Sequence, residues 1–230
     1  MTSSAIAIDG PVASGKSTVG SRVAAALGRP FVDTGTMYRA FTWFALQQGV
    51  EPADAKSLAH LAAEVRMQVL PPAPASREYA TVLVNGEDAT PYLRTPAVER
   101  AVSLVSAVPA VRRQMVSLQR ELAAHGPLVM AGRDIGTVVL RDAPLKIFLE
   151  ASAETRAGRR AAELARAGRP EPLEHVLEET RRRDRLDSER ADSPLRPASD
   201  AVRIQTDELS EDEVVHRVLD LARATFGAGA

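Results

Sequence analysis

The clearest chemical pattern in the chain lies near its amino terminus. Residues 10–17 read Gly-Pro-Val-Ala-Ser-Gly-Lys-Ser and fit the pattern G-x-x-x-x-G-K-[ST] in full. Glycines at both ends allow a loop to curl so that several backbone N–H groups point at one phosphate. Lys16 can reach the β- and γ-phosphates of a nucleoside triphosphate, and the hydroxyl of Ser17 can ligate Mg²⁺. The motif predicts triphosphate binding and leaves open what is done with the triphosphate.

This phosphate loop requires a strand before it and a helix after it, and the flanking residues predict both. Residues 5–8 form a short apolar run rich in branched side chains, as in a buried strand. Apolar residues then recur at helical spacing over 19–27, and Gly28 is a typical helix stop. A helix starting near Lys16 would add the positive end of its dipole. We therefore favour a phosphate cradle over a chance glycine-rich turn.

Strands and helices are expected to alternate along the rest of the chain. Further short apolar strands are predicted at 30–32, 127–131, 145–149 and 201–205. Helices are predicted at about 36–48, 53–65, 96–124 with an interruption near Pro109, 153–190 with a break at 168–170, and from 210 onward with an acidic first turn. This alternation predicts an α/β fold with a buried parallel sheet.

The middle of the chain has a pattern of short strands and turns that differs from the alternation of strands and helices elsewhere. Residues 66–70 predict a strand, and the prolines of 71–74 predict a stiff loop. Residues 78–84 followed by Asn85-Gly86 are typical of a hairpin. We expect a small β-rich insertion at about 66–95.

Composition excludes several classes of function. The 230 residues are 45% hydrophobic, which is enough to bury a sizeable core. The formal net charge of −1 and the 4% of aromatic residues argue against binding long nucleic acid or stacking bases along a strand. The absence of cysteine excludes disulfides, a thiolate zinc site and a cysteine nucleophile. Residues 1–8 do not resemble a signal peptide and the run 101–111 is too short for a membrane span, so we expect a cytoplasmic protein without membrane partners.

The remaining choice concerns the use of the triphosphate. The chain lacks the Asn-Lys-x-Asp that a regulatory GTPase would carry, and the strand expected at 127–131 ends without the acid typical of motor ATPases. A small kinase fits better. Its chemistry needs arginines around the acceptor, because donor and acceptor phosphates repel each other and the transferring group spreads negative charge.

Arginines that could serve an acceptor occur in three places. Arg39 lies on the helix expected after the second strand, and its simplest interpretation is a surface charge. Arg133 follows the expected strand at 127–131, at the edge where open α/β sheets bind ligands. The third group, Arg183, Asp187 and Arg190, is spaced to share one helical face. Taken alone, this group suggests a solvated helix held by Asp–Arg pairs.

Four segments together resemble bacterial cytidylate kinases, which belong to the nucleoside monophosphate kinase family. They are 8–17, 33–39 (Asp-Thr-Gly-Thr-Met-Tyr-Arg), 132–139 (Gly-Arg-Asp-Ile-Gly-Thr-Val-Val) and 183–190 (Arg-Asp-Arg-Leu-Asp-Ser-Glu-Arg), in the order and at the spacings of that family. The resemblance implies a P-loop NTPase-type parallel five-stranded sheet flanked by helices, with an insertion that binds the nucleoside monophosphate and a short lid. The implied division is 1–33, 101–152 and 170–230 for the core, 34–100 for the insertion and 153–169 for the lid.

The resemblance also implies a reaction and its partners. The γ-phosphoryl group of ATP would pass to CMP or dCMP by Mg²⁺-assisted in-line transfer, as part of pyrimidine nucleotide metabolism. ATP and CMP or dCMP would be the small-molecule partners, and a monomer is expected. The implied ATP-binding residues are Gly10, Pro11, Val12, Ala13, Ser14, Gly15, Lys16, Ser17, Thr18 and Arg159, with Ser17 as the metal ligand.

The same resemblance assigns roles to individual residues outside the phosphate loop. Arg39, Arg133 and Arg190 would hold the acceptor phosphate; Thr34, Ser103, Arg112 and Asp134 would surround the cytosine; Arg183 and Asp187 would hold the ribose; Arg156, Arg159 and Arg160 would belong to the lid. The implied catalytic set is Lys16, Arg133, Arg156, Arg160 and Arg190. One position departs from the pattern, because Ala131 stands where relatives often carry an acid; Asp9 or Asp33 would have to take over any metal–water role.

Chemistry supports the choice of base in part. A carboxylate such as that of Asp134 accepts a hydrogen bond from the cytosine 4-amino group, and Arg112 can donate to N3 or O2. Uracil reverses the donor and acceptor pattern at both positions of the base, so Asp134 would face a carbonyl oxygen. A site left with unpaired polar groups can discriminate strongly.

Alternative functions find less support in the sequence. Asp33-Thr34-Gly35 spells the aspartic-protease triplet, but that chemistry needs two carboxylates, usually in an all-β protein. The four histidines, His60, His125, His175 and His216, are scattered and form no H-E-x-x-H. A second class of function stays open, in which nucleotide binding controls a protein that binds RNA through residues 181–190. Within kinases, the alternative acceptor is UMP or a sugar-like metabolite.

Overall fold

The computed structural model describes residues 4–70, 80–190 and 192–227, and its chain divides into two compact units. Unit 1 comprises Met1–Arg29 and Pro127–Ala230, and unit 2 comprises Pro30–Gly126. The predicted loop at 71–74 and the start of the strand predicted at 78–84 lie outside the described residues.

The larger sheet has five strands in the order β2-β6-β1-β7-β8, which confirms the predicted α/β fold class. The strands are β1 (Ile6–Asp9), β2 (Phe31–Asp33), β6 (Val129–Gly132), β7 (Leu145–Glu150) and β8 (Val202–Gln205). Strand β1 pairs in parallel with both β6 and β7, so Asp9 lies opposite Gly132 on one side and Phe148 on the other. All four residues of β1 are buried, as expected for a strand covered on both faces. The sheet order reverses at β1, which makes its carboxyl end a topological switch point where such sheets bind ligands.

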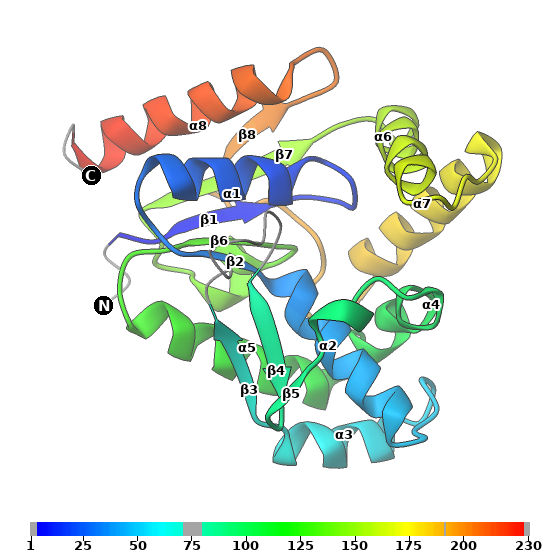
Figure 1. Ribbon diagram of the computed structural model, residues 1–230. Helices are drawn as coiled ribbons and strands as arrows, with labels where there is room; N and C mark the ends of the chain where they lie inside the picture. The colour runs from blue at the N-terminus through cyan, green and yellow to red at the C-terminus, as the bar shows by residue number, and fades with distance from the viewer. Residues whose placement is uncertain (1–3, 71–79, 191, 228–230) are drawn as a thin grey trace. The chain divides into compact units, whose positions relative to one another are not determined.

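The helices of unit 1 follow the strands closely. They are α1 (Lys16–Ala26), α6 (Ala153–Arg166), α7 (Leu173–Ser188), α8 (Glu211–Phe226) and the short π-helix η2 (Ile135–Val139). Helices α1 and α8 pack on each other on the same side of the strands (Figure 1). Helix α8 opens with the predicted acidic first turn and with a capping box between Ser210 and Glu213, which satisfies two otherwise unpaired backbone donors. Helices α6 and α7 pack side by side around Ala157, Leu164 and Val176.

The described part of unit 2 contains four helices and a small antiparallel sheet. The helices are α2 (Thr34–Gln47), α3 (Ala55–Glu64), α4 (Pro96–Val105) and α5 (Pro109–Ala124), with the 3₁₀ turn η1 (Thr90–Tyr92). The sheet has the order β3 (Met67–Leu70), β4 (Thr81–Val84), β5 (Glu87–Asp88). The predicted hairpin is confirmed, because Asn85 and Gly86 link β4 to β5 with positive φ angles of 51° and 88°.

The unit boundaries and one helix end differ from the sequence-based expectation. Residues 30–33 and 101–126, which the implied division places in the core, belong to unit 2, in which α4 packs on α2 and α5 packs on α3. The helix predicted to run to Arg190 ends at Ser188, so Arg190 lies beyond the helix rather than on a shared face with Arg183. The assignment of separate substrate-binding and lid functions to these parts stays a prediction.

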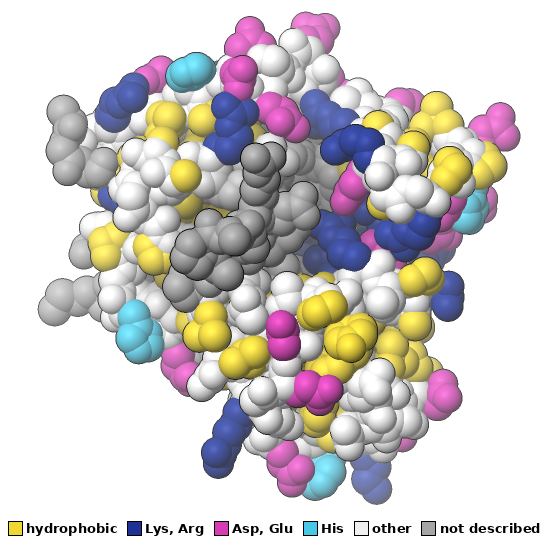
Figure 2. All heavy atoms as spheres, viewed as in Figure 1, with side chains coloured by type: hydrophobic (Ala, Val, Ile, Leu, Met, Phe, Trp, Pro, Cys, Tyr) yellow, Lys and Arg dark blue, Asp and Glu magenta, His cyan; other side chains and the backbone are white. Residues whose placement is uncertain are grey.

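The surface carries charges of both signs. Figure 2 shows Lys and Arg side chains intermixed with Asp and Glu over the face that it displays, in keeping with the formal net charge of −1. Among the described residues we find no helix with both the length and the apolar character that crossing a membrane requires.

Candidate active site

The phosphate loop follows β1 directly and takes the expected backbone shape. Gly10, Ala13 and Gly15 have φ angles of 151°, 56° and 92°, so the chain enters the left-handed region three times within six residues. Gly10 is irreplaceable on steric grounds, since a Cβ there would lie 2.3 Å from the carbonyl oxygen of Leu149. Such alternation of backbone conformations turns successive N–H groups toward one point, which is the arrangement that binds an anion.

Lys16 begins α1 and its ammonium group closes over the loop. Its Nζ donates hydrogen bonds to the carbonyl oxygen of Pro11 and, at 3.3 Å, to the hydroxyl of Ser14. Although Lys16 is only 7% exposed, it lies where the helix dipole and the loop N–H groups also favour negative charge. Ser17 lies in the first turn of the same helix, and Thr18 after it is exposed. The loop residues that the sequence singled out are thus brought together in one local structure.

Asp9, the last residue of β1, anchors the segment that follows Arg133 and Asp134. The backbone N–H groups of Ile135 and Gly136, at the start of η2, donate to its two carboxylate oxygens at 2.8 and 2.7 Å. Burial raises the pKa of Asp9 to about 7, although these two hydrogen bonds lower it. A Cβ at Gly136 would lie 3.1 Å from Cδ of Lys146, so the glycine leaves room for that side chain beside η2. Asp9 therefore connects the start of the phosphate loop to the Arg133–Asp134 segment.

Three residues of unit 1 form what we call the arginine cluster: Arg133, Asp187 and Arg190. Arg133 Nε donates to Asp187 Oδ2 at 2.8 Å across 54 residues of sequence. Arg190 Nη2 donates to the other carboxylate oxygen of Asp187. The side chain of Asp187 is 2% exposed, and those of Arg133 and Arg190 are 20% and 10% exposed. A solvated helix surface is therefore the wrong interpretation, because these pairs are desolvated.

Two further residues of the acceptor set lie close to this cluster in the chain. Asp134, which follows Arg133, is 4% exposed. Arg183 lies half-buried on α7, one turn before Asp187. Asp187 was expected to hold a ribose, and in the structure both of its carboxylate oxygens accept hydrogen bonds from arginines.

The arginines expected in the lid are all on the first two turns of α6, and each contacts a different partner. Arg156 pairs with Asp184 on α7 and is 4% exposed. Arg159 donates to the hydroxyl and the carbonyl oxygen of Thr206 at 3.0 and 2.6 Å. Arg160 pairs with Glu163 on its own helix. The three residues therefore belong to an ordered helix of unit 1.

In unit 2, Asp33 and Arg39 flank the start of α2. Asp33 caps this helix by accepting a hydrogen bond from the backbone N–H of Gly35 at 2.8 Å. A Cβ at Gly35 would lie 2.9 Å from Arg39 Nη1, so the missing side chain leaves room for the guanidinium one turn later. Arg39 is half-buried, which excludes the interpretation as a plain surface charge. Thr34, the first residue of α2, is buried.

Arg112 is buried on α5 in the same unit. Its Nη1 donates to the carbonyl oxygen of Ser106 at 3.2 Å, and its guanidinium lies 5.5 Å from the ring centroid of Tyr38. The aromatic face attracts the cation, so Arg112 is held by a dipole and a ring. Ser103 on α4 is half-buried, and its carbonyl oxygen accepts a hydrogen bond from Ser106. The four residues expected from unit 2 thus belong to helices α2, α4 and α5.

The oxygens available for a metal ion fit a Mg²⁺ that arrives with a nucleotide. Within the described ranges, no group of three or more metal-ligating side chains could hold an ion by itself. Mg²⁺ commonly keeps waters and substrate phosphates as ligands and takes only one or two from the protein. The hydroxyl of Ser17, beside the loop, is such a hard oxygen donor. The carboxylates of Asp9 and Asp33 each accept backbone hydrogen bonds instead.

Sequence reasoning missed three features around the site. The hydrogen bonds that Asp9 accepts from Ile135 and Gly136 were missed, although Asp9 itself was noted for a metal–water role. Asp184 was not singled out, although it lies within the segment 183–190. The pair of Lys146 with Asp200 was also missed, since no local pattern links residues 54 positions apart. Lys146 is 8% exposed, and its stem lies beside Gly136.

Comparisons with known proteins agree with this geometry. The model of the family described as cytidylate kinase matches residues 6–224. A cytidylate kinase of Geobacillus kaustophilus (strain HTA426) is 50% identical over 222 residues, which cover 96% of this chain and 97% of the relative. One of Mycobacterium avium (strain 104) is 49% identical over 219 residues, covering 95% and 94%. A crystal structure of an uncharacterized protein from Eubacterium ventriosum ATCC 27560 has a TM-score of 0.50 at 14% identity, over 96% of this chain and 99% of the other, a likeness of fold alone.

Proposed function

The chain belongs to the cytidylate kinase family, and from this premise we propose that it transfers the γ-phosphoryl group of ATP to CMP or dCMP, giving ADP and CDP or dCDP. The observation that carries the proposal is that one compact unit holds both a phosphate loop and a buried arginine cluster. A kinase must bind one polyanion on each side of the reacting phosphorus. The phosphate loop suits the donor, and the arginine cluster suits the acceptor.

On the donor side, the backbone N–H groups of residues 10–17 would hold the phosphates of ATP. Lys16 would exchange its contacts with Pro11 and Ser14 for the β- and γ-phosphates, since an ammonium binds phosphate more strongly than a neutral oxygen. Mg²⁺ bound with ATP would neutralise charge on these phosphates, with Ser17 as its protein ligand. Arg156, Arg159 and Arg160 would act on the same phosphates from α6.

On the acceptor side, Arg133 and Arg190 would bind the phosphate of the nucleoside monophosphate. A guanidinium has five N–H donors, so holding a carboxylate and binding a phosphate are compatible. Asp187 orients both groups before any substrate arrives, and such preorganisation is what makes charge stabilisation effective in catalysis. The reaction then needs in-line positioning and charge neutralisation, without a covalent enzyme intermediate.

For the base, we propose a direct role for Asp134 in unit 1 and roles for Thr34, Ser103 and Arg112 in unit 2, with Arg39 toward the acceptor phosphate. A buried carboxylate accepts from the 4-amino group of cytosine and would face a carbonyl oxygen of uracil. Leaving buried polar groups unpaired is costly, so UMP should be disfavoured. Arg183 and Asp187 are proposed for the ribose. A monomeric state, a cytoplasmic location and a place in pyrimidine nucleotide metabolism stay predictions.

The acceptor is tested directly with a panel of substrates. ADP formation from ATP and Mg²⁺ would be followed in a coupled assay with CMP, dCMP, UMP, AMP or a polyol as acceptor. We expect ADP only with a nucleoside monophosphate, and the highest kcat/KM with CMP or dCMP, at least about tenfold above that with UMP. Equal rates with UMP would contradict the base assignment. ADP formation without any acceptor would favour the nucleotide-controlled binding protein instead.

A further inference from the structure

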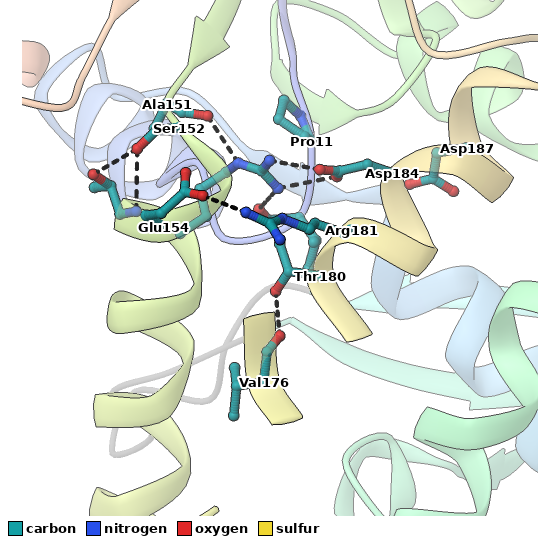
Figure 3. Close-up of polar contacts among 12 residues, drawn as sticks. Pro11, Ala151, Ser152, Glu154, Val176, Thr180, Arg181, Asp184 and Asp187 are labelled. Carbon is teal, nitrogen blue, oxygen red and sulfur yellow. Dashed lines mark hydrogen bonds and ion pairs between the residues drawn. The ribbon is translucent and has the colours of Figure 1, made fainter. Parts of the chain in front are cut away.

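Helix α7 carries two aspartates one turn apart; Asp184 pairs with one arginine and Asp187 with two. Asp187 orients the arginine cluster, as described above. Asp184 binds Arg156 with both carboxylate oxygens: Nη1 donates to Oδ1 at 3.0 Å and Nη2 donates to Oδ2 at 2.6 Å. Figure 3 shows the carboxylate of Asp184 meeting the guanidinium that comes from α6. Two parallel bonds fix the plane of a guanidinium as well as its position.

The other contacts of Arg156 place it against the phosphate loop. Its Nε donates to the carbonyl oxygen of Ala151 at 2.9 Å, and Nη1 donates to that of Val12 at 3.3 Å. Ser152 fixes the start of α6 by capping the N–H of Thr155, and it donates to Asp207 through both its N–H and its hydroxyl. Arg156 is therefore attached to the loop between β7 and α6, to the phosphate loop and to α7.

We propose that Asp184 is a positioning residue of the donor site. It holds the guanidinium of Arg156 in the orientation and position in which that group contacts the donor phosphates. The inference rests on the proposed function, in which Arg156 acts on those phosphates. Asp184 does not touch substrate in this account. It sets the orientation of a group that does.

The attraction between Arg156 and Asp184 is strong enough to fix the guanidinium because the pair is largely buried. The side chains of Arg156 and Asp184 are 5% and 26% exposed, so water and salt screen their attraction only in part. Glu154 also lies in the field of Arg156, but it pairs with Arg181. Asp184 is thus the carboxylate that neutralises Arg156 in the described structure. Without it, two carbonyl oxygens would hold the guanidinium, and its plane could turn.

A neighbouring pair provides a built-in control. Glu154 on α6 and Arg181 on α7 join the same two helices at 2.6 Å, and Figure 3 shows them beside the Asp184 contact. Their side chains are 62% and 54% exposed. An exposed pair of this kind contributes little to stability. Comparing the two pairs separates positioning of Arg156 from simple cross-linking of α6 to α7.

Both aspartates lie on α7 but pair with different arginines, so we expect their loss to affect different substrates. Asp184 faces the donor side through Arg156, and Asp187 faces the acceptor side through Arg133 and Arg190. Loss of Asp184 should therefore lower kcat/KM for ATP and leave KM for CMP nearly unchanged. A residue that only stabilises the fold would not produce such a split.

The test is steady-state kinetics of Asp184→Asn in the full-length chain, with Glu154→Gln as the matched control. For Asp184→Asn we expect kcat/KM for ATP to fall about ten- to a hundredfold, because a misplaced catalytic group costs rates of that order. The KM for CMP should stay within about twofold. Glu154→Gln should match the wild type. An equal rise of KM for ATP and KM for CMP, or the same loss in Glu154→Gln, would overturn the inference.

A double variant shows whether Asp184 acts through Arg156. If it does, Asp184→Asn combined with Arg156→Ala should be no slower than Arg156→Ala alone, and full additivity would overturn the proposal. Near-normal turnover of Arg156→Ala would instead refute the proposed role of Arg156 itself. An impaired Arg156→Ala beside a normal Asp184→Asn would refute only the positioning role.

If Asp184→Asn does not fold, Asp184→Glu provides a second test. This variant keeps the charge but shifts the carboxylate, so it should show a smaller loss that is specific to ATP. Wild-type ATP kinetics in Asp184→Glu would reject the inference.

Discussion

The phosphate loop and the arginine cluster lie in the same unit but are built in opposite ways. The loop owes its shape to the backbone, through positive φ angles at Gly10, Ala13 and Gly15 within one short stretch. The cluster owes its shape to side chains, since one buried carboxylate holds guanidinium groups that come from two distant segments. A backbone-built site can lose a side chain and keep its form. A site built from paired charges cannot, because the partner that remains is buried without compensation.

The largest effect is expected for Lys16→Ala, which removes the one side-chain charge of the loop and leaves its backbone intact. We expect kcat to fall by on the order of a hundredfold or more, as when one preorganised charge is lost. The melting temperature should change little, because the hydrogen bonds that Lys16 donates to Pro11 and Ser14 stay within the phosphate loop. A coupled assay and a thermal melt measure both quantities.

The control for this experiment is Lys56→Ala, which makes the same substitution at an exposed residue of α3. It should leave turnover unchanged. Near-normal turnover of Lys16→Ala would refute the donor role of Lys16. A large loss of stability would show that the loop depends on this side chain, and the contrast with the arginine cluster would fail.

A smaller effect on activity, together with a loss of stability, is expected for Arg190→Ala, which removes one of the two cations on Asp187. Arg133 stays to neutralise the carboxylate, so the protein should fold with reduced stability. We expect KM for CMP to rise about tenfold, kcat to fall, and KM for ATP to be largely spared, since charge-assisted contacts to an anion are lost on the acceptor side only. Kinetics with each substrate varied in turn measure this split.

The control is Arg185→Ala on α7, which removes an exposed arginine from the same helix. Its kinetics should equal those of the wild type. If Arg190→Ala instead abolishes folding, or changes stability without changing KM for CMP, the pair with Asp187 is structural only. That result would separate the arginine cluster from acceptor binding.

The same contrast explains what could be predicted from the sequence. The phosphate loop is contiguous, so its eight residues contain the whole pattern, and the flanking β1 and α1 are where periodicity predicts them. The arginine cluster is not contiguous. The spacing from Arg183 to Arg190 predicted one helical face, but α7 ends at Ser188 and Arg190 reaches Asp187 from beyond the helix end.

Contacts across the sheet were also beyond sequence reasoning. Asp9 meets Ile135 and Gly136 over 126 and 127 residues, a contact that exists only because β1 and β6 pair with Asp9 opposite Gly132. Local periodicity carries no information about that register. The acid beside Gly10 could be noticed from the sequence, but its hydrogen-bond partners could not.

The smallest effect concerns Asp9, which belongs to both regions, because it precedes the loop and anchors the segment after Arg133 and Asp134. Its folded-state pKa is about 7 against an ordinary 3.8, chiefly because burial penalises the charged form; Asp134 raises it further, and Lys16 and the two backbone hydrogen bonds lower it. Between these two pH values the folded chain therefore binds more protons than the unfolded chain. The contribution of Asp9 to stability is complete below about pH 4 and is lost as the pH rises through about 7.

Asp9→Asn removes this titration and offers an amide where two backbone donors require acceptors. The free energy of unfolding, measured by urea titration from pH 4.5 to 7.5, should be lower in the variant, and the difference from wild type should shrink as the pH rises. Parallel curves would show that Asp9 has an ordinary pKa. Turnover should fall only a few fold, because the amide oxygen can still accept one of the two N–H groups and hold η2 in part. If turnover fell as far as in Lys16→Ala, the backbone that shapes the phosphate loop would itself depend on a side-chain anchor, and the distinction between the two regions would be one of degree.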